Sequence, residues 1–151
     1  MDMHGELDPA MVLEQLRQAI NRHDLDALAA CFAPDYLSEF PAHPDRAFRG
    51  HEQMAKNWGR IFGGVPDLAA TLVGCTVAGA TAWAEWDWRG NRRDGAAFAL
   101  RGVTIQGIVA GRIVWTRLYM EPVEAAGAGS DAAVRRTVAG DAPGAAGGGT
   151  R

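Results

Sequence analysis

Two side chains in the first third of this sequence have the chemistry needed to transfer a proton. Glu39 and His43 lie four residues apart, and a carboxylate and an imidazole commonly serve as general base and partner acid. We therefore expect both residues to be catalytic, with Tyr36 as a phenol donor to the substrate. The alternative interpretation is that Glu39 faces solvent or pairs with Arg46 or Arg49.

Other common catalytic and cofactor-binding signatures are absent from the sequence. It contains no glycine-rich phosphate loop, no GxSxG motif and no HExxH motif. Its two cysteines, Cys31 and Cys75, have neither CxxC spacing nor a histidine pair nearby, so a zinc site is not expected. Both cysteines lie in apolar stretches and are predicted to be buried thiols. We expect no cofactor and no metal.

The charge of the chain argues against two classes of partner. Its formal net charge is −3 and its pI is about 5.8, and it lacks the basic stripe of a nucleic-acid-binding protein. No apolar run approaches the roughly 18 residues needed to cross a membrane, and the first residues do not resemble a signal peptide. We expect no nucleic-acid or membrane partner and a cytoplasmic location.

Composition divides the 151 residues into one domain and two flanking segments. Hydrophobic residues make up 48% of the chain, as in a globular protein. Residues 125–151 contain nine alanines and seven glycines, too little apolar surface to offset the entropy of ordering. We predict a flexible N-terminus over 1–8, a folded domain over 9–124 and a disordered tail over 125–151.

Helical spacing and capping residues predict three helices in the first half of the domain. Asp8 precedes a proline and caps a helix over about 9–22. Asp24 caps a second, shorter helix that Pro34 stops. A third helix starts near His51 and carries an apolar face that includes Met54, Trp58, Ile61 and Phe62.

A period of two replaces the helical period from Leu68 onward. It predicts strands at about 68–78, 81–89, 96–108 and 111–121, joined by hairpin turns. Residues 36–40 could add a short strand. Helices first and strands second predict an α+β fold, with three helices packed on one face of an antiparallel sheet of four to six strands.

Alternation along the predicted strands gives the sheet one apolar face. We assign this face to the concave side beneath the helices, where its side chains would bind a substrate. Its members are Trp86, Trp88, Phe98, Leu100, Leu118 and Met120.

The opposite face mixes charged and aromatic side chains. Glu85, Asp87, Arg101 and Arg117 could pair across strands on it. Trp83, Trp115 and Tyr119 are of the kind found at protein interfaces. We expect a homodimer through this convex face.

The order of these elements and several short motifs resemble a known superfamily. The motifs lie at residues 21–28, 33–35, 48–51, 84–86, 101–103, 111–114 and 117–121. The chain resembles the nuclear transport factor 2-like superfamily, in its SnoaL-like polyketide cyclase and ketosteroid isomerase-like branch. The resemblance implies a cone-shaped α+β barrel with a pocket between the concave face and the helices.

The resemblance also implies a class of function. Active members of the branch are cofactor-free enzymes, so we expect an isomerase, cyclase or dehydratase acting on a small hydrophobic, possibly polycyclic substrate. The alternative is a non-catalytic module of the same fold that binds a small molecule or another protein. Trp58 would either pack in the core or contact a flat ligand.

The chain departs from the superfamily at its usual catalytic positions. Epoxide hydrolases of this fold carry polar groups where this sequence has Trp86, Trp88 and Leu118, so limonene-type epoxide hydrolysis is not expected. The last-strand acid of SnoaL-like cyclases also falls at Leu118. The resemblance then favours Glu39 as the base, because its short strand forms the pocket mouth in the family. Alternation predicts that Glu121 faces away from the pocket.

Overall fold

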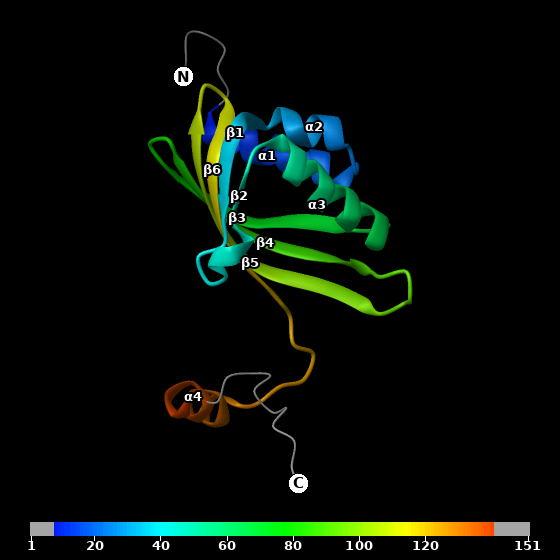
Figure 1. Cartoon of the computed structure of the whole chain (residues 1–151), viewed down its shortest axis with the longest axis vertical. Helices are drawn as coiled ribbons and strands as arrows, with labels where there is room; N and C mark the ends of the chain where they lie inside the picture. The colour runs from blue at the N-terminus through cyan, green and yellow to red at the C-terminus, as the bar shows by residue number, and fades with distance from the viewer. Residues whose placement is uncertain (1–7, 141–151) are drawn as a thin grey trace.

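The chain forms one curved sheet with three helices against it (Figure 1). The computed structural model describes residues 8–140. In chain order the helices are α1 (Pro9–Asn21), α2 (Leu25–Ala30), η1 (Pro44–Arg46), α3 (His51–Gly64) and α4 (Ser130–Ala139); the strands are β1 (Phe32–Glu39), β2 (Phe48–Arg49), β3 (Ala69–Ala78), β4 (Thr81–Asn91), β5 (Ala97–Val109) and β6 (Arg112–Pro122). The predicted α+β class is confirmed.

The six strands lie in the order β2-β1-β6-β5-β4-β3. Strands β3 to β6 form the expected antiparallel meander. The prediction of a wholly antiparallel sheet was wrong, because β1 pairs parallel to β6. These two strands are far apart in sequence and no hairpin joins them. Only strands joined by a tight turn must run antiparallel, so the sequence does not set the relative direction of this pair.

Both predicted helix caps are present. The side chain of Asp8 accepts a hydrogen bond from the Met11 amide at the start of α1, and that of Asp24 accepts one from the Ala27 amide at the start of α2. The expected stop at Pro34 was wrong, since α2 ends at Ala30 and Pro34 lies within β1. Proline fits there because the β1–β6 register shifts between Phe32 and Leu37.

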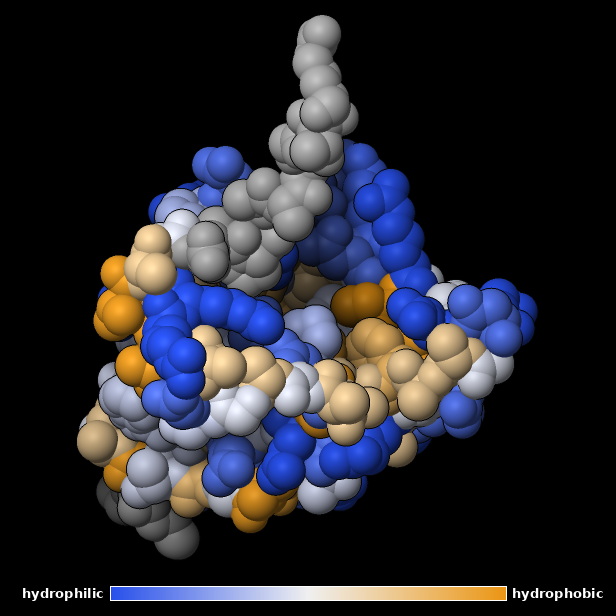
Figure 2. Space-filling model, turned by 90° about the horizontal axis from the view of Figure 1, so that it is seen from below, coloured by the Kyte–Doolittle hydropathy of each residue, from blue (hydrophilic) through white to orange (hydrophobic). Residues whose placement is uncertain are grey.

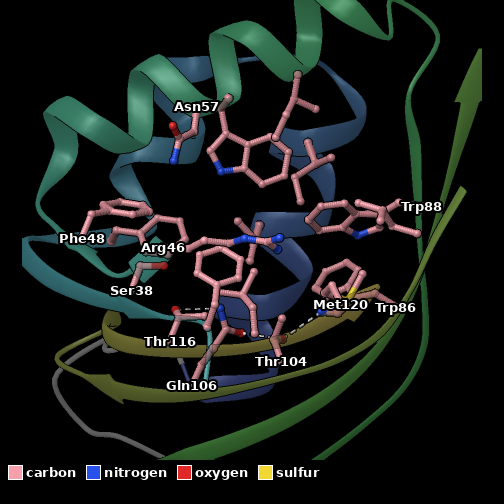
Figure 3. A pocket seen from close by; sticks show the side chains of 18 of the residues that line it. Ser38, Arg46, Phe48, Asn57, Trp86, Trp88, Thr104, Gln106, Thr116 and Met120 are labelled. Atoms are coloured by element: carbon pink, nitrogen blue, oxygen red, sulfur yellow. Dashed lines mark hydrogen bonds between the residues drawn. The ribbon is translucent and has the colours of Figure 1, made fainter. Parts of the chain in front are cut away.

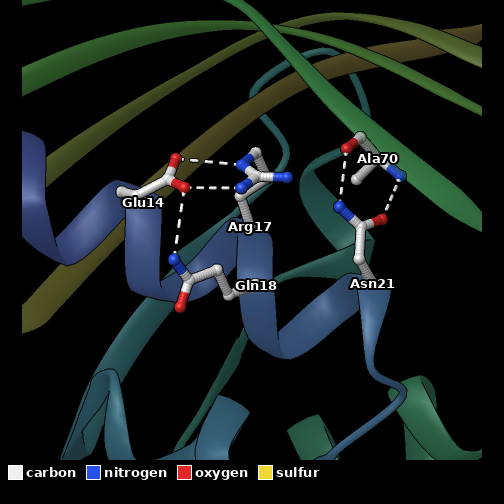
Figure 4. Close-up of polar contacts among 5 residues, drawn as sticks. All are labelled: Glu14, Arg17, Gln18, Asn21 and Ala70. Carbon is white, nitrogen blue, oxygen red and sulfur yellow. Dashed lines mark hydrogen bonds and ion pairs between the residues drawn. The ribbon is translucent and has the colours of Figure 1, made fainter.

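The end of α1 is fixed to the sheet by a side-chain amide (Figure 4). Asn21 donates to the Ala70 carbonyl at 3.0 Å and accepts from the Ala70 amide at 2.7 Å. Earlier in the helix, Arg17 forms hydrogen bonds with Glu14, which lower the pKa of that carboxyl. Asn21 thus pairs with both backbone groups of Ala70, as a neighbouring strand would. This contact holds the end of α1 against β3.

The predicted hairpin between the last two strands is closed by Ala110 and Gly111. Both have positive φ, 52° and 72°, as a two-residue type I′ turn requires. This turn fixes the β5–β6 register, which places Thr104 opposite Leu118 and Gln106 opposite Thr116. The inward side chains of the two strands therefore lie next to one another.

The convex face carries the charged and aromatic side chains expected from alternation. Arg101 lies 3.8 Å from Asp87, and the Arg117 guanidinium lies 4.9 Å from the centre of the Trp115 ring. Trp83 and Tyr119 are exposed. This face therefore presents aromatic surface to solvent, and the homodimer through it stays a prediction.

Residues beyond β6 differ in part from the predicted tail. Residues 130–139 form helix α4, which begins beside an Asp131–Arg135 ion pair and ends at Gly140 with φ 79°. Every residue of α4 is exposed, so this helix adds nothing to the core. The predictions for 1–7 and 141–151 lie outside the described residues. None of the described helices is long and apolar enough to cross a membrane.

Candidate functional site

A cavity of about 370 Å³ lies between the concave face of the sheet and helices α1 and α3. Volumes of this size are typical of sites for small molecules. The space-filling view from below shows the hollow, with apolar residues around it (Figure 2). Helix α1 contributes Leu16 and Ile20 to the wall, and α3 contributes Asn57, Trp58 and Ile61.

Three tryptophans form one side of the cavity. The ring centres of Trp58 and Trp88 are 5.3 Å apart, and those of Trp86 and Trp88 are 6.3 Å apart at a steep angle. Trp86 and Trp88 are nearly fully buried, and the indole nitrogen of Trp88 has no hydrogen-bond partner in the described part of the chain. The wall offers flat apolar surface to a ring system.

The structure brings together most of the residues predicted to bind a substrate. The side chains that line the cavity include Tyr36, Trp58, Trp86, Trp88, Leu100, Leu118 and Met120. Phe98 does not line it. Phe98 shares the inward face of β5 with Leu100, but it pairs with Gly90 near the end of the β4–β5 hairpin, and it packs against the edge of the core.

A polar strip crosses the apolar floor of the cavity (Figure 3). Trp86 Nε1 donates to Thr104 Oγ1 at 2.9 Å, Thr104 donates to Gln106 Oε1 at 3.5 Å, and Gln106 Nε2 donates to Thr116 Oγ1 at 3.4 Å. All four residues are buried. Thr104 and Gln106 each accept one hydrogen bond and donate the next. The Thr116 hydroxyl accepts the last bond, so its own hydrogen can be donated to a ligand oxygen.

Gln106 was not among the site residues predicted from the sequence, although the signal was present. Gln106 continues the inward series that runs along β5 through Leu100 and Thr104. A glutamine on an otherwise apolar face needs hydrogen-bond partners, and Thr104 and Thr116 supply them.

Strand β1 places Tyr36 and Ser38 in the cavity wall. Tyr36 packs against Phe32 and Phe48 at ring-centre distances of 4.5 and 5.9 Å, and burial raises the pKa of its phenol. Tyr36 therefore stays protonated across the physiological pH range and can donate a hydrogen bond.

The structure does not place Glu39 in the cavity wall. Side chains alternate along β1, so Ser38 and then Phe40 line the cavity while Glu39, between them, does not. Because the expected location of Glu39 depended on a pocket-facing orientation, its predicted catalytic role loses its geometric basis.

A carboxylate does line the cavity at its mouth, and it is Glu121. The expectation that Glu121 faces away was wrong, because Glu121 lines the cavity and its carboxylate contacts His43, although it keeps its pairing with Arg101 near the end of β6. His43 donates from Nε2 to Glu121 Oε1 at 2.8 Å. The two side chains are 38% and 56% exposed, respectively, so the pair is open to solvent and to a ligand entering the cavity.

Two further polar side chains lie toward the mouth. Arg46, at the end of η1, lines the cavity, and the close-up shows its side chain reaching into the space (Figure 3). Asn57 faces the same space from α3, and its Oδ1 accepts a hydrogen bond from Gln53 Nε2 at 2.8 Å. The Asn57 nitrogen therefore remains free to donate into the cavity.

The two cysteines differ from each other. Cys31 is buried, donates to the Ala27 carbonyl at 3.4 Å, and has its pKa raised by burial to about 11. The prediction that Cys75 is buried was wrong, since Cys75 is exposed on β3. Across residues 8–140, no three His, Cys, Asp or Glu side chains are arranged to hold a metal ion.

The sequence of this chain matches a known domain family. The SnoaL-like domain matches residues 13–116, which is more than half of the chain. The chain belongs to the SnoaL-like domain family. The family lies in the nuclear transport factor 2-like superfamily, as the sequence motifs predicted. No curated protein matches this SnoaL-like chain.

Solved structures with the same fold carry several different names. Wild-type IdmH, a candidate polyketide cyclase from Streptomyces antibioticus, is 22% identical with a TM-score of 0.68, covering 76% of this chain and 93% of that one. An LEH-like epoxide hydrolase from M. tuberculosis is 19% identical with a TM-score of 0.63, covering 74% and 80%.

A third structure is a hypothetical protein from Catenulispora acidiphila with a ketosteroid isomerase-like fold, in complex with trimethylamine. It is 19% identical with a TM-score of 0.63, covering 74% of this chain and 85% of that one. At these identities the three likenesses show the SnoaL-like fold alone, so the activity has to be argued from the side chains in the pocket.

Proposed function

We propose that this SnoaL-like protein is a cofactor-free enzyme that moves a proton on a small hydrophobic substrate, as an isomerase, cyclase or dehydratase does. The observation that carries the proposal is the 2.8 Å contact between His43 and Glu121 at the mouth of an apolar cavity. A carboxylate held by an imidazole and open to a ligand is a general base with a partner that can return the proton.

The rest of the cavity supports binding and orientation of such a substrate. The tryptophan wall offers a stacking surface for a ring. The hydrogen-bond series that begins at Trp86 leaves the Thr116 hydroxyl free to donate. Thr116 can therefore hold a substrate oxygen by a hydrogen bond. Thr116 lies within β6 and Glu121 lies near its end, so we infer that a substrate oxygen held by Thr116 lies deeper in the cavity than the group that reacts at Glu121.

One observation favours a second function, which is binding without turnover. Leu118 stands where the resemblance would place the acid of a SnoaL-like cyclase, and the carboxylate that does line the cavity is largely exposed. A carrier or sensor of small molecules would need only the apolar walls and the polar strip. The two functions differ in whether Glu121 is needed for chemistry.

Hydrogen exchange on a simple ketone separates them. With 1-tetralone in deuterated buffer, the enzyme is expected to accelerate replacement of the protons next to the carbonyl, observed by NMR. The substitution Glu121→Gln should lower the rate about 100-fold or more, the usual contribution of a general base. Glu85→Gln on the convex face is the matched control. Binding of 1-tetralone without any acceleration of exchange would leave the carrier function standing.

A further inference from the structure

The cavity of this protein contains a cation without a counter-ion. Arg46 lines the cavity, and within residues 8–140 its guanidinium makes no ion pair and no side-chain hydrogen bond. Asp45 is its neighbour in η1, and Glu121, which lines the same cavity, is engaged by His43. Arg46 is exposed as a whole and Glu121 lines the same cavity, but no acid in the described part of the chain forms an ion pair with the Arg46 guanidinium, which is therefore available to a ligand anion.

The placement of Arg46 follows from its turn. It ends the 3-10 helix η1, which starts at Pro44, and its amide donates to the His43 carbonyl at 3.0 Å. Residue 46 is exposed as a whole, but its side chain is directed inward (Figure 3). An unpaired guanidinium on a surface turn is better hydrated when it extends into solvent. An inward orientation is therefore favoured when the cavity holds an anion that pairs with it.

The neighbouring polar groups are also donors. Asn57 uses its oxygen to accept from Gln53, which leaves its nitrogen facing the cavity (Figure 3). Ser38 is buried in the opposite wall and carries a hydroxyl. A guanidinium, an amide nitrogen and a hydroxyl around one apolar space can all donate to the same acceptor, and an ionised carboxylate is the group that accepts several such bonds.

We propose that the ligand of this cavity is an amphipathic carboxylic acid, with Arg46 binding the carboxylate and the tryptophan wall binding the apolar body. This inference deepens the proposed function, on which it rests for the identity of the pocket, by giving the substrate class. A planar carboxylate matches the two parallel N–H groups of a guanidinium. The role of Arg46 is recognition, and the proton-transfer step remains with Glu121.

A matched pair of probes tests the inference by calorimetric titration of the full chain. 2-Naphthoate and 2-naphthamide have nearly the same shape and differ in charge. The wild-type protein should bind 2-naphthoate about 10-fold more tightly or better, which is about 1.4 kcal/mol, because the guanidinium donates charge-assisted hydrogen bonds to the carboxylate. Arg46→Gln should remove that preference and leave the affinity for 2-naphthamide unchanged.

The control is Arg60→Gln, which removes the same charge from an exposed position on α3 outside the cavity wall; it should retain the preference. Equal binding of the two probes by the wild type, or a preference that survives in Arg46→Gln, would overturn the inference and leave the enzyme proposal intact. Binding of neither probe would overturn the inference, and the enzyme proposal would then be decided by 1-tetralone exchange. If the wild type prefers 2-naphthoate in an Arg46-dependent way but does not accelerate 1-tetralone exchange, only the enzyme proposal would be overturned.

Discussion

Trp86 donates its indole N–H to the hydroxyl of Thr104 at 2.9 Å, across neighbouring strands and inside the concave face. This bond starts the polar strip that continues through Gln106 to Thr116. It allows a nearly fully buried tryptophan to form part of the cavity wall without leaving its nitrogen unpaired.

Removing the Thr104 hydroxyl is expected to destabilise the protein. Thr104→Val keeps the shape of the side chain but leaves the Trp86 nitrogen and the Gln106 carbonyl oxygen without this partner. We expect the free energy of unfolding to fall by about 1–3 kcal/mol, measured by denaturant titration. Thr76→Val, at an exposed position on β3, is the control. An unchanged midpoint in Thr104→Val would show that the strip contributes nothing to stability.

Burial of Cys31 predicts a loss of stability in alkaline solution. Its pKa is raised from 9.0 to about 11 in the folded protein, so the folded state holds the thiol proton more tightly. The stabilisation is fully present below pH 9 and is lost as pH rises toward 11. Cys31→Ala should therefore lose less stability than wild type between these two pH values. The free energy of unfolding of both proteins would be measured by denaturant titration at several pH values. Equal losses of stability between pH 9 and 11 would contradict this prediction.

The exposed aromatic side chains of the convex face support a proposed homodimer. Trp83 and Tyr119 are 47% and 43% exposed on it. Sedimentation equilibrium at micromolar concentration should give a dimer for the wild type and a monomer for Trp83→Lys combined with Tyr119→Lys. Met11→Lys, an exposed apolar position on α1, is expected to remain dimeric. A monomeric wild type at this concentration would rule the homodimer out.

Local patterns predicted most of the fold of this SnoaL-like protein. The period-two alternation located β3 to β6 to within two residues at each end, and Ala110-Gly111 predicted the turn that sets the β5–β6 register. The parallel pairing of β1 with β6 was missed, because strands that are distant in sequence and not joined by a hairpin leave no local signal. Helix α4 was also missed, since its alanine-rich segment buries no side chain.

The site was predicted less completely than the fold. Alternation identified Trp86 and Trp88 of the tryptophan wall, together with Leu118 and Met120, because side chains alternate between the two faces of a strand. It failed at Glu121, which is paired with Arg101 near the end of β6 and yet lines the cavity mouth and contacts His43. It gave no orientation for Glu39, since the faces of β1 could be assigned only once its pairing with β6 was known.

The assignment of Glu121 as the catalytic base is tested most directly by comparing Glu121→Gln with Glu39→Gln in the 1-tetralone exchange measurement. The two carboxylates lie near the ends of neighbouring strands, β6 and β1, but only Glu121 lines the cavity. With Glu121 as the base, exchange is expected to be lost in Glu121→Gln and retained in Glu39→Gln, with both variants folded. Full exchange in Glu121→Gln together with loss in Glu39→Gln would contradict this assignment and return the catalytic base to β1.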